Sequence, residues 1–436
     1  MGNRVCKKIL YYIDVICISP LAVFSGEEGT TDNSILYDYD GIPFVSGTTL
    51  AGAFRNYYNL EKNKDSLFGF SDSDNGVGRM SSVYISDMRF ESCNVNVLIR
   101  NGVELNDNKA VVTKGKYDFE AIEPGNKGKF IIELVIRESD EQREDVWKKQ
   151  IIQILSALDT NQIRIGAHKS RGYGKLRIDA IRKNVYTRHN ILEYKNAYDY
   201  DKYILLPDIK EELLQDILTK YVKIKIPLKM NGGLSIREYS AKKNLPDFVQ
   251  LTVHENGTDI PVIPGTSIAG AIRHRVVEIL TELGISCIDY IINSIFGYVD
   301  GTEAHISNVI FDECRIIGAK KLILSRNAIS RFESATKDGA LYREMAYYGG
   351  NCIMTIYVNK EIYVKSSSEV NINISDYVIG FILIALKDLQ NGYLSIGGQT
   401  SIGRGIFEED GSIVITEGIC SEEEYISNCI KLLEEI

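Results

Sequence analysis

A twelve-residue pattern occurs twice in this chain, and the two copies lie half a chain apart. The first copy runs from Phe44 to Arg55 and the second from Val262 to Arg273, an offset of 218 residues in a chain of 436. In each copy an apolar run meets a glycine, then two hydroxyl residues, then an apolar stretch that ends at an arginine. This order predicts a strand, a tight turn and a helix N-terminus.

The predicted helix starts are candidate phosphate sites. A helix N-terminus presents backbone N–H groups and the positive end of the helix dipole, and the arginine follows about two turns later. A single copy would indicate only the start of a helix, but the recurrence favours binding. The residues of the two predicted sites are Gly47, Thr48, Thr49 and Arg55 in the first half and Gly265, Thr266, Ser267 and Arg273 in the second.

Four further landmarks recur in the same order, which indicates an internal duplication. They are Phe68-Gly69 and Phe296-Gly297 (offset 228), Arg100 and Arg326 (226), Glu120 and Glu344 (224), and Gly172 and Gly403 (231). Because these offsets differ by only a few residues, we expect the insertions and deletions that distinguish the two halves to lie in loops. Strand and helix patterns alternate within each half, so the predicted class is α+β. We expect a first unit over residues 1–184, a link over 185–220 and a second unit over 221–436.

Periodicity places the main elements within each half. Strands are predicted at the start of the chain, over 130–136, over 222–228 and over 305–311. Helices are predicted over 139–158, where Ser139 is a candidate cap, over 378–389 and near 211–221. The only tryptophan, Trp147, is expected in the core.

Composition excludes several classes of protein. The net charge of −9 argues against a surface uniformly adapted to nucleic acid, although it permits a local basic groove. The eight cysteines form no C-x-x-C pair, so neither a zinc ribbon nor a disulfide framework is indicated. No apolar run has transmembrane length, and the first segment reads as a strand, so we expect a cytoplasmic protein without a membrane partner.

The ordered motifs resemble those of the RAMP superfamily of CRISPR proteins, in particular the backbone subunits of type III effector complexes. The resemblance is carried in duplicate by the Gly-Thr-Thr and Pro-Gly-Thr-Ser helix starts, the Phe-Gly pairs, the arginine hairpins and the glycine loops 166–174 and 397–405. It spans nearly the whole chain outside 185–220. Ser46 and Ala167-His168 depart from the usual motif residues.

The resemblance implies two tandem ferredoxin-like domains, similar to RNA-recognition motifs, each with a thumb hairpin. It further implies that the partners are CRISPR guide RNA, complementary target RNA and other effector subunits. Together with the residues of the helix starts, the implied RNA-binding residues are Arg100, His168, Lys169, Arg171, Arg326, Gln399 and Arg404.

The resemblance also implies metal-dependent cleavage of target RNA by an aspartate in the loop before each helix motif. The matching residues are Asp32 and Asp247. A carboxylate there could hold Mg²⁺ or Mn²⁺ or align a ribose 2′-hydroxyl with its phosphate. Two such units predict two evenly spaced cuts. Competing carboxylates in the first loop are Glu27, Glu28, Asp38 and Asp40, and His254 is a candidate base in the second.

Two other functions remain open from the sequence. The chain could be a non-catalytic scaffold that binds guide RNA and neighbouring subunits. It could also be a guide-processing endoribonuclease, which would use a histidine as general base. Cleavage of complementary target RNA would distinguish an RNA-guided endoribonuclease from the scaffold. Cleavage of repeat RNA by the isolated chain would indicate the guide-processing endoribonuclease.

Overall fold

A computed structural model describes most of the chain, and its contacts divide it into two compact units. The described residues are 4–26, 31–58, 67–72, 75–91, 95–105, 111–214, 219–238, 246, 248–255, 257–300, 303–365 and 371–435. Unit 1 comprises residues 1–99, 118–169 and 173–218, and unit 2 comprises 100–117, 170–172 and 219–436. Two short segments of the first half of the sequence, 100–117 and 170–172, therefore pack as part of unit 2.

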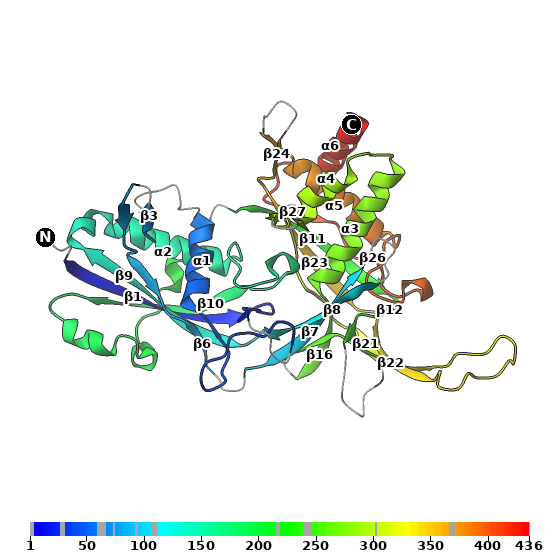
Figure 1. Cartoon of the computed structure of the whole chain (residues 1–436), viewed down its shortest axis with the longest axis horizontal. Coiled ribbons are helices and arrows are strands. Elements are labelled where there is room, and N and C mark those ends of the chain that lie inside the picture. The colour runs from blue at the N-terminus through cyan, green and yellow to red at the C-terminus, as the bar shows by residue number, and fades with distance from the viewer. Residues whose placement is uncertain are drawn as a thin grey trace. The chain divides into compact units, whose positions relative to one another are not determined.

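Unit 1 is built on one six-stranded sheet with the order β10-β1-β9-β6-β2, in which β5 also pairs with β9 (Figure 1). Every pairing in this sheet is antiparallel. The strands are β1 (Val5–Cys17), β2 (Phe44–Val45), β5 (Val83–Ile85), β6 (Met88–Phe90), β9 (Lys127–Arg137) and β10 (Leu176–Tyr186). The strand expected over 130–136 is confirmed within β9.

Two helices supply the core of unit 1 on one face of this sheet. They are α1 (Gly47–Tyr58) and α2 (Glu144–Asp159), and the short helix η2 (Glu138–Arg143) precedes α2. Alternate residues of β1 face this core, and Trp147 is buried in it, as expected. The predicted cap at Ser139 is wrong: the residue before α2 is Arg143, and the Ser139 hydroxyl instead donates to Asp140.

The remaining elements of unit 1 are short or form a hairpin. They are β3 (Phe70–Asp72), paired with β4 (Val77–Arg79), and the first residue of η3 (Lys169–Arg171), whose other two residues belong to unit 2. The hairpin of β7 (Val97–Leu105) and β8 (Val111–Ile122) begins and ends in unit 1, while its residues 100–117 belong to unit 2.

Residues 187–214, which the sequence analysis treats as most of a link, pack on the second face of the unit 1 sheet. We call this segment the strap. It contains η4 (Ile191–Asn196), η5 (Tyr200–Tyr203) and η6 (Lys210–Glu212). A small apolar cluster joins Tyr203 and Ala197 of the strap to Leu10 and Tyr12 of β1. The short helix expected near 211–221 corresponds in the described residues to the single turn of η6.

Unit 2 repeats this architecture with the strand order β19-β23-β11-β26, in which β27 also pairs with β11. All pairings within this one sheet are antiparallel. The strands are β11 (Tyr221–Asn231), β19 (Val309–Phe311), β23 (Asn351–Asn359), β26 (Ile406–Glu409) and β27 (Val414–Thr416). The strand expected over 305–311 is split, because β18 ends at His305 and β19 starts at Val309.

Four helices pack with this sheet or with each other. They are α3 (Gly265–Glu282), α4 (Ile288–Phe296), α5 (Ser375–Gln390) and α6 (Glu422–Glu435). The helix expected over 378–389 lies within α5. Among the described residues, no helix is both long enough and apolar enough to cross a membrane.

A second sheet of unit 2 carries a long hairpin, β21 (Lys320–Arg326) with β22 (Tyr342–Tyr348), drawn in yellow at its far end in Figure 1. The other strands of this sheet are β12 (Gly233–Leu234), β13 (Arg237–Glu238) and β14 (Phe248–Gln250). Smaller sheets contain β15 (Thr252–Glu255), β16 (Thr258–Ile263), β20 (Cys314–Arg315), β17 (Tyr298–Asp300), β18 (Glu303–His305), β24 (Tyr363–Lys365) and β25 (Asn371–Asn373), together with the short η7 (Thr400–Ile402) in the glycine loop.

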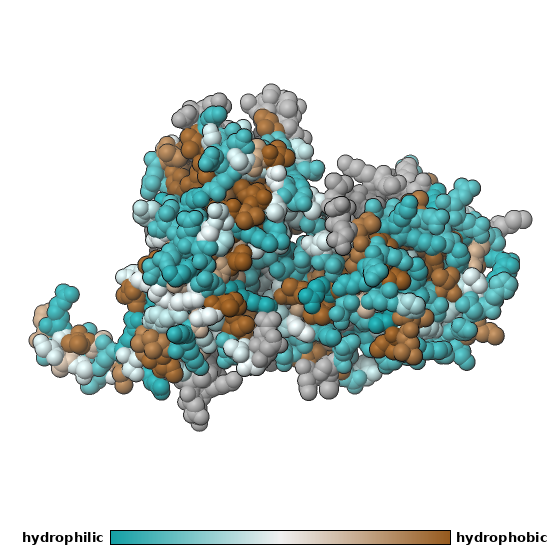
Figure 2. Space-filling view, turned by 180° about the vertical axis from the view of Figure 1, so that it is seen from behind, coloured by the Kyte–Doolittle hydropathy of each residue, from teal (hydrophilic) through white to brown (hydrophobic). Residues whose placement is uncertain are grey.

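Apolar side chains interrupt the otherwise hydrophilic surface in several places (Figure 2). Phe332, between β21 and β22, is 98% exposed, and Ile329 and Leu341 of the same hairpin are also exposed. Their exposure shows that this hairpin does not bury its apolar side chains within unit 2.

Candidate nucleic-acid interface

Asp32 lies between β1 and β2, and a reciprocal pair of hydrogen bonds ties it to Asp118 of β8. The Asp32 N–H donates to Asp118 Oδ1 at 2.9 Å, and the Asp118 N–H donates to Asp32 Oδ2 at 2.9 Å. The Asp32 side chain is exposed and Asp118 is half-buried. Two carboxylates therefore meet at the surface of unit 1, and the pairing leaves Asp32 Oδ1 and Asp118 Oδ2 outside these two bonds.

The same loop is anchored by Glu120, two residues farther along β8. The buried Glu120 carboxylate accepts from the Ile35 N–H at 3.0 Å and from the Tyr37 hydroxyl at 3.2 Å. Burial, reinforced by the negative charge of Glu120, raises the pKa of Tyr37 to about 12. The backbone adds a bridge between Asn33 and Phe119. The loop that carries Asp32 is thus held against β8 by both side chains and backbone.

The other candidate carboxylates differ in their surroundings. Asp38 Oδ1 accepts from the Asp40 and Ile42 N–H groups, both at 2.9 Å, so Asp38 stabilises a turn. Asp40 is exposed. The expected catalytic residue Asp247 and the competing Glu27 and Glu28 lie outside the described residues.

The start of α1 is capped by side chains of unit 1. The Gly47 N–H donates to Asp87 Oδ1 at 2.8 Å, and the Ser46 hydroxyl accepts from the Thr49 N–H at 3.3 Å. The Thr48 and Thr49 hydroxyls also lie 2.9 Å from the Ser46 oxygen. A carboxylate thus occupies the place where the sequence predicts a phosphate. Gly47 has a packing role as well, because a Cβ there would collide with the Ile85 carbonyl oxygen.

The start of α3 is different, because Pro264 provides no side-chain cap. Within unit 2, residues 170–172 lie against this start, and a Cβ on Gly265 would collide with the carbonyl oxygens of Phe311 and Arg171. Arg273, two turns farther along α3, is exposed, as are Thr266 and, at the equivalent place in α1, Arg55, while Ser267 is half-buried. The positive end of the helix dipole therefore lies at this start, and an exposed arginine follows two turns farther along the same helix.

Arg171 adds a second positive charge beside α3. Its Nη1 is buried and has no hydrogen-bond partner among the described residues. Burial lowers the pKa of the Arg171 guanidinium; nearby Tyr117 raises it and the positive charge of Arg273 lowers it. An arginine stays protonated under these conditions, so the positive charges of Arg171 and Arg273 repel each other. A bound anion would satisfy the buried nitrogen and relieve the repulsion.

Arg100, a predicted RNA-binding residue, instead forms an ion pair inside unit 2. Its Nη1 lies 3.3 Å from Glu313 Oε2, and the two side chains are only 4% and 7% exposed. Glu313 follows β19 by two residues, as Asp87 follows β5 in unit 1. The Arg100 guanidinium is therefore withdrawn from the surface and paired with a carboxylate inside unit 2, and its contact with RNA stays a prediction.

Arg326, Gln399 and Arg404 converge on one buried carboxylate, that of Glu344. Glu344 Oε2 lies 3.3 Å from Arg326 Nε and 3.5 Å from Arg404 Nη2. With its amide oriented to match its neighbours, Gln399 donates to Glu344 Oε1 at 2.8 Å and accepts from Arg237 at 3.0 Å. Arg404 is 3% exposed and its guanidinium lies 4.7 Å from the centre of the Tyr348 ring, so its charge organises the interior of unit 2, and its contact with RNA stays a prediction.

His168 occupies the position in the first glycine loop that Gln399 occupies in the second. Both residues have positive φ angles, 52° and 59°. The His168 ring packs in unit 1 among Phe119 at 4.5 Å, Tyr173 at 5.6 Å and Phe24 at 5.7 Å. An aromatic cluster thus replaces the polar cluster of unit 2. The neighbouring Lys169 is exposed.

His254 forms an exposed cross-strand pair with Asp259. Its Nδ1 lies 2.9 Å from Asp259 Oδ1 in the hairpin of β15 and β16. The described residues contain no group of three or more histidine, cysteine, aspartate or glutamate side chains arranged to hold a metal ion. Within the described ranges, Asp32 and Asp118 are the paired carboxylates nearest to the predicted catalytic position.

Both halves of the chain match the model of one known family. A model of the RAMP superfamily matches residues 14–177 and again residues 222–408. The chain belongs to the RAMP superfamily. The two matched regions confirm a tandem pair of RAMP domains, as the repeated motifs predict. A search of curated proteins gives no match.

Each matched RAMP region contains one of the two helix starts with its glycine, Gly47 of α1 or Gly265 of α3. Sequence reasoning did not identify Asp118, Asp87 or Glu313 in these regions. Asp118 stands two residues before the recurring Glu120, but the same offset leads to Tyr342 in the second RAMP region, so recurrence does not reveal it. The recurrence of Glu120 and Glu344 did mark the two carboxylates that anchor neighbouring segments.

Proposed function

We propose that this RAMP protein is a backbone subunit of a type III CRISPR effector complex that binds guide RNA and cleaves complementary target RNA. In each unit we assign the strand orders β10-β1-β9-β5 and β26-β11-β23-β19 to the ferredoxin-like arrangement. The β7–β8 and β21–β22 hairpins are the proposed thumbs. The exposed Arg331 and Lys337 of the second hairpin, together with exposed Phe332, support contact with RNA.

The observation that carries RNA binding is the pair of arginines at the uncapped start of α3. Arg171 and Arg273 place two positive charges beside a helix N-terminus, and Arg171 Nη1 is buried without a described partner. Phosphate oxygens accept several hydrogen bonds, and their negative charge would compensate the two arginines. A guide-RNA phosphate is therefore the proposed ligand, and base pairing supplies the choice of sequence.

For cleavage we propose Asp32 in unit 1 and, by its place in the sequence, Asp247 in unit 2. Asp32 and Asp118 offer oxygen ligands of the kind that Mg²⁺ and Mn²⁺ prefer. Such a cation would neutralise the charge that develops on the scissile phosphate. The hydrogen bond from the Asp118 N–H fixes Asp32, whose carboxylate then aligns the ribose 2′-hydroxyl with the adjacent phosphate. The products are a 2′,3′-cyclic phosphate and a free 5′-hydroxyl.

The test is to purify the chain with the products of its neighbouring genes, sequence the bound RNA and map cuts in a complementary target. We expect two cuts in the wild type, loss of one in Asp32→Ala and of the other in Asp247→Ala. Persistence of both cuts in the double variant would refute the catalytic assignment.

The same experiment separates the alternatives. A bound guide with an uncut target at millimolar Mg²⁺ or Mn²⁺ would indicate a non-catalytic scaffold. Cutting of repeat RNA by the isolated chain would indicate a guide-processing nuclease with a histidine base. Absence of bound RNA would refute the proposal as a whole.

A further inference from the structure

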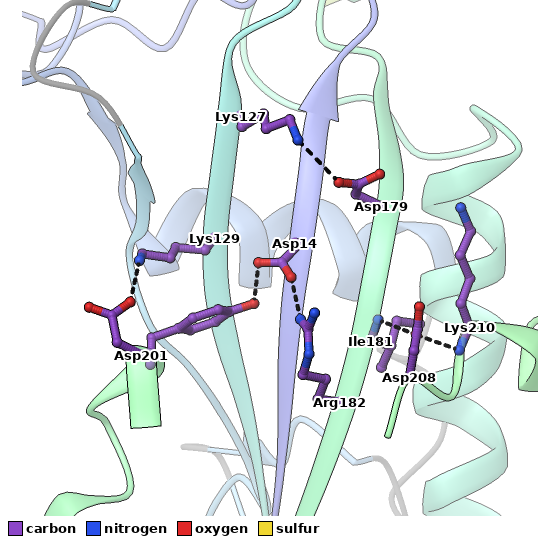
Figure 3. A network of polar contacts seen from close by, with 10 residues as sticks. Asp14, Lys127, Lys129, Asp179, Ile181, Arg182, Asp201, Asp208 and Lys210 are labelled. Carbon is purple, nitrogen blue, oxygen red and sulfur yellow. Dashed lines mark hydrogen bonds and ion pairs between the residues drawn. The ribbon is translucent and has the colours of Figure 1, made fainter. Parts of the chain in front are cut away.

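The two sheets differ on the faces that point away from their main helices. In unit 1 the strap lies over this face, and we call the corresponding face of unit 2 the outer face. The strap and β1 are joined by hydrogen bonds: the Tyr12 hydroxyl of β1 donates to the Ala197 carbonyl of the strap at 2.9 Å, and the Tyr200 hydroxyl of the strap donates to Asp14 of β1 at 2.5 Å. Figure 3 shows Asp14 of β1 paired with Arg182 of β10, and Asp201 of the strap paired with Lys129 of β9.

Strand register identifies the equivalent positions in unit 2. Phe130 and Met354 are separated by 224 residues, the same offset as Glu120 and Glu344. Their partners on the neighbouring strands are Ile13 and Ile226, which both face the core. Neighbours along a strand point to opposite faces, so the outward residues Leu10, Tyr12 and Asp14 of β1 correspond to Lys223, Lys225 and Pro227 of β11. Covered apolar and aromatic positions are thus replaced by lysines.

The outer face of unit 2 is basic and partly apolar. Lys225 of β11 is exposed and lies between Thr355 of β23 and Val414 of β27, its two cross-strand partners. Val414 is 49% exposed and Ile353, next along β23 on the same face, is 60% exposed. Among the described residues, no segment corresponding to the strap covers these side chains.

We propose that the outer face of unit 2 binds an acidic, tyrosine-containing segment of a partner protein. The strap gives the chemical precedent within this chain. Lys8 of β1 donates to the Tyr194 hydroxyl at 2.7 Å, and its Nζ lies 4.0 Å from the centre of that ring. Lys223 already lies 5.6 Å over the ring of Tyr357. Strand lysines and tyrosines therefore pair on both sheets. Because the outer face carries more lysines than the covered face of unit 1, carboxylates of a partner would complement its charge.

Protein suits this face better than RNA for two reasons. First, Ile353 and Val414 gain by burial under apolar groups, which a phosphate backbone does not offer. Second, a carboxylate stands at its edge. Glu408 lies 2.5 Å from Nζ of Lys229, its cross-strand partner on the outer face. This negative charge opposes a phosphate backbone but can be matched locally by a partner that carries both signs of charge.

The test uses a fluorescein-labelled random copolymer of glutamate and tyrosine as the probe, with the full chain saturated by oligouridine so that its RNA site is filled. We expect the copolymer to bind, and Lys225→Glu to weaken binding at least tenfold. Ile353→Ser, a second variant at an exposed position, should weaken it three- to fivefold. Lys149→Glu, an exposed lysine on α2, is the matched control and should bind as the wild type does.

Three outcomes would overturn the proposal: no binding of the copolymer, equal weakening by Lys149→Glu, or loss of binding when oligouridine is added. The last outcome, with weaker oligouridine binding by Lys225→Glu, would identify the outer face as an RNA site. Thermal melting of each variant confirms folding, and Ile353→Ser keeps the test valid if Lys225→Glu unfolds.

Discussion

Arg171 combines a cost to folding with a gain for binding. A buried guanidinium nitrogen without a hydrogen-bond partner destabilises a protein by about 1–3 kcal/mol, and the nearby charge of Arg273 adds repulsion. A structural role alone would not retain such a residue beside an uncapped helix start. A phosphate ligand accounts for both its place and its charge.

We therefore predict that Arg171→Ala weakens guide-RNA binding without lowering the melting temperature. The slope of log K against log salt concentration should fall by about 1, because one phosphate contact is lost. Arg275→Ala is the control on the same helix, since Arg275 pairs with Asp388 at 2.7 Å. That variant should lose some stability and keep its affinity for RNA. An unchanged salt slope in Arg171→Ala would contradict the assignment.

Asp118 and Asp32 allow positioning to be separated from charge. Asp118→Ala removes the acceptor of the Asp32 N–H, whereas Asp118→Asn keeps an oxygen at that place. We expect single-turnover cleavage at the unit 1 position to fall about tenfold in Asp118→Ala, equivalent to ~1.4 kcal/mol, and to be largely retained in Asp118→Asn. Equal loss in both would show instead that the negative charge of Asp118 is required, as for a metal ligand.

The strap is held to the unit 1 sheet by a carboxylate that must stay ionised. Burial alone would raise the pKa of Glu133, but hydrogen bonds from Lys8, Tyr198 and Tyr194 outweigh it and lower that pKa below its ordinary value of 4.5. The unfolded chain therefore takes up a proton first as the pH falls. The ionised Glu133 therefore makes its full contribution to the stability of the folded state above pH 4.5, and this contribution is lost as the pH falls below that value.

This coupling predicts a pH-dependent difference between two variants. Between pH 6 and pH 3 the melting temperature of Glu133→Gln should fall less than that of the wild type, because glutamine can still accept from the strap tyrosines but does not titrate. Glu138→Gln, at an exposed position, should follow the wild-type curve. Parallel curves for wild type and Glu133→Gln would show that the strap does not depend on this charge.

Helices, central strands and the duplication followed from the sequence because they depend on local periodicity and on motif order. The glycine before α1 and α3 is one example, since only glycine fits against the carbonyl oxygens of Ile85 and Phe311. The strap could not be predicted in this way. Its tyrosines and acids read as a polar link, and only the long-range contacts of Tyr198 and Tyr200 with the sheet reveal its packing.

The candidate site was predicted in part for the same reason. Asp32 was placed by its distance from the motif glycine, but its partner Asp118 comes from a strand 86 residues away. The burial of a side chain also could not be predicted from the sequence: Arg100 and Arg404 are of the residue type that contacts RNA, but both lie in the interior. Residue type and order thus predicted which segments meet, while exposure decided which side chains can reach a ligand.

The two units do not follow the two halves of the sequence, since residues 100–117 and 170–172 pack with unit 2. The second unit therefore depends on side chains encoded in the first half. The pair of Arg100 and Glu313 is buried, with both side chains less than a tenth exposed. Removal of Arg100 takes this ion pair away from the buried Glu313 carboxylate, and loss of one partner of a buried pair costs up to about 3–5 kcal/mol.

We accordingly predict that Arg100→Met destabilises the full chain by about 3 kcal/mol in urea unfolding monitored by intrinsic fluorescence. The double variant Arg100→Met with Glu313→Met should recover most of this loss, because the buried charge is gone and methionine fills the space. Lys127→Met, which breaks an exposed pair with Asp179 of 3.5 Å, is the control and should change stability by less than about 1 kcal/mol. A double variant as unstable as Arg100→Met would mean that the hairpin is held to unit 2 by its other contacts, and that this ion pair serves only to fix its register.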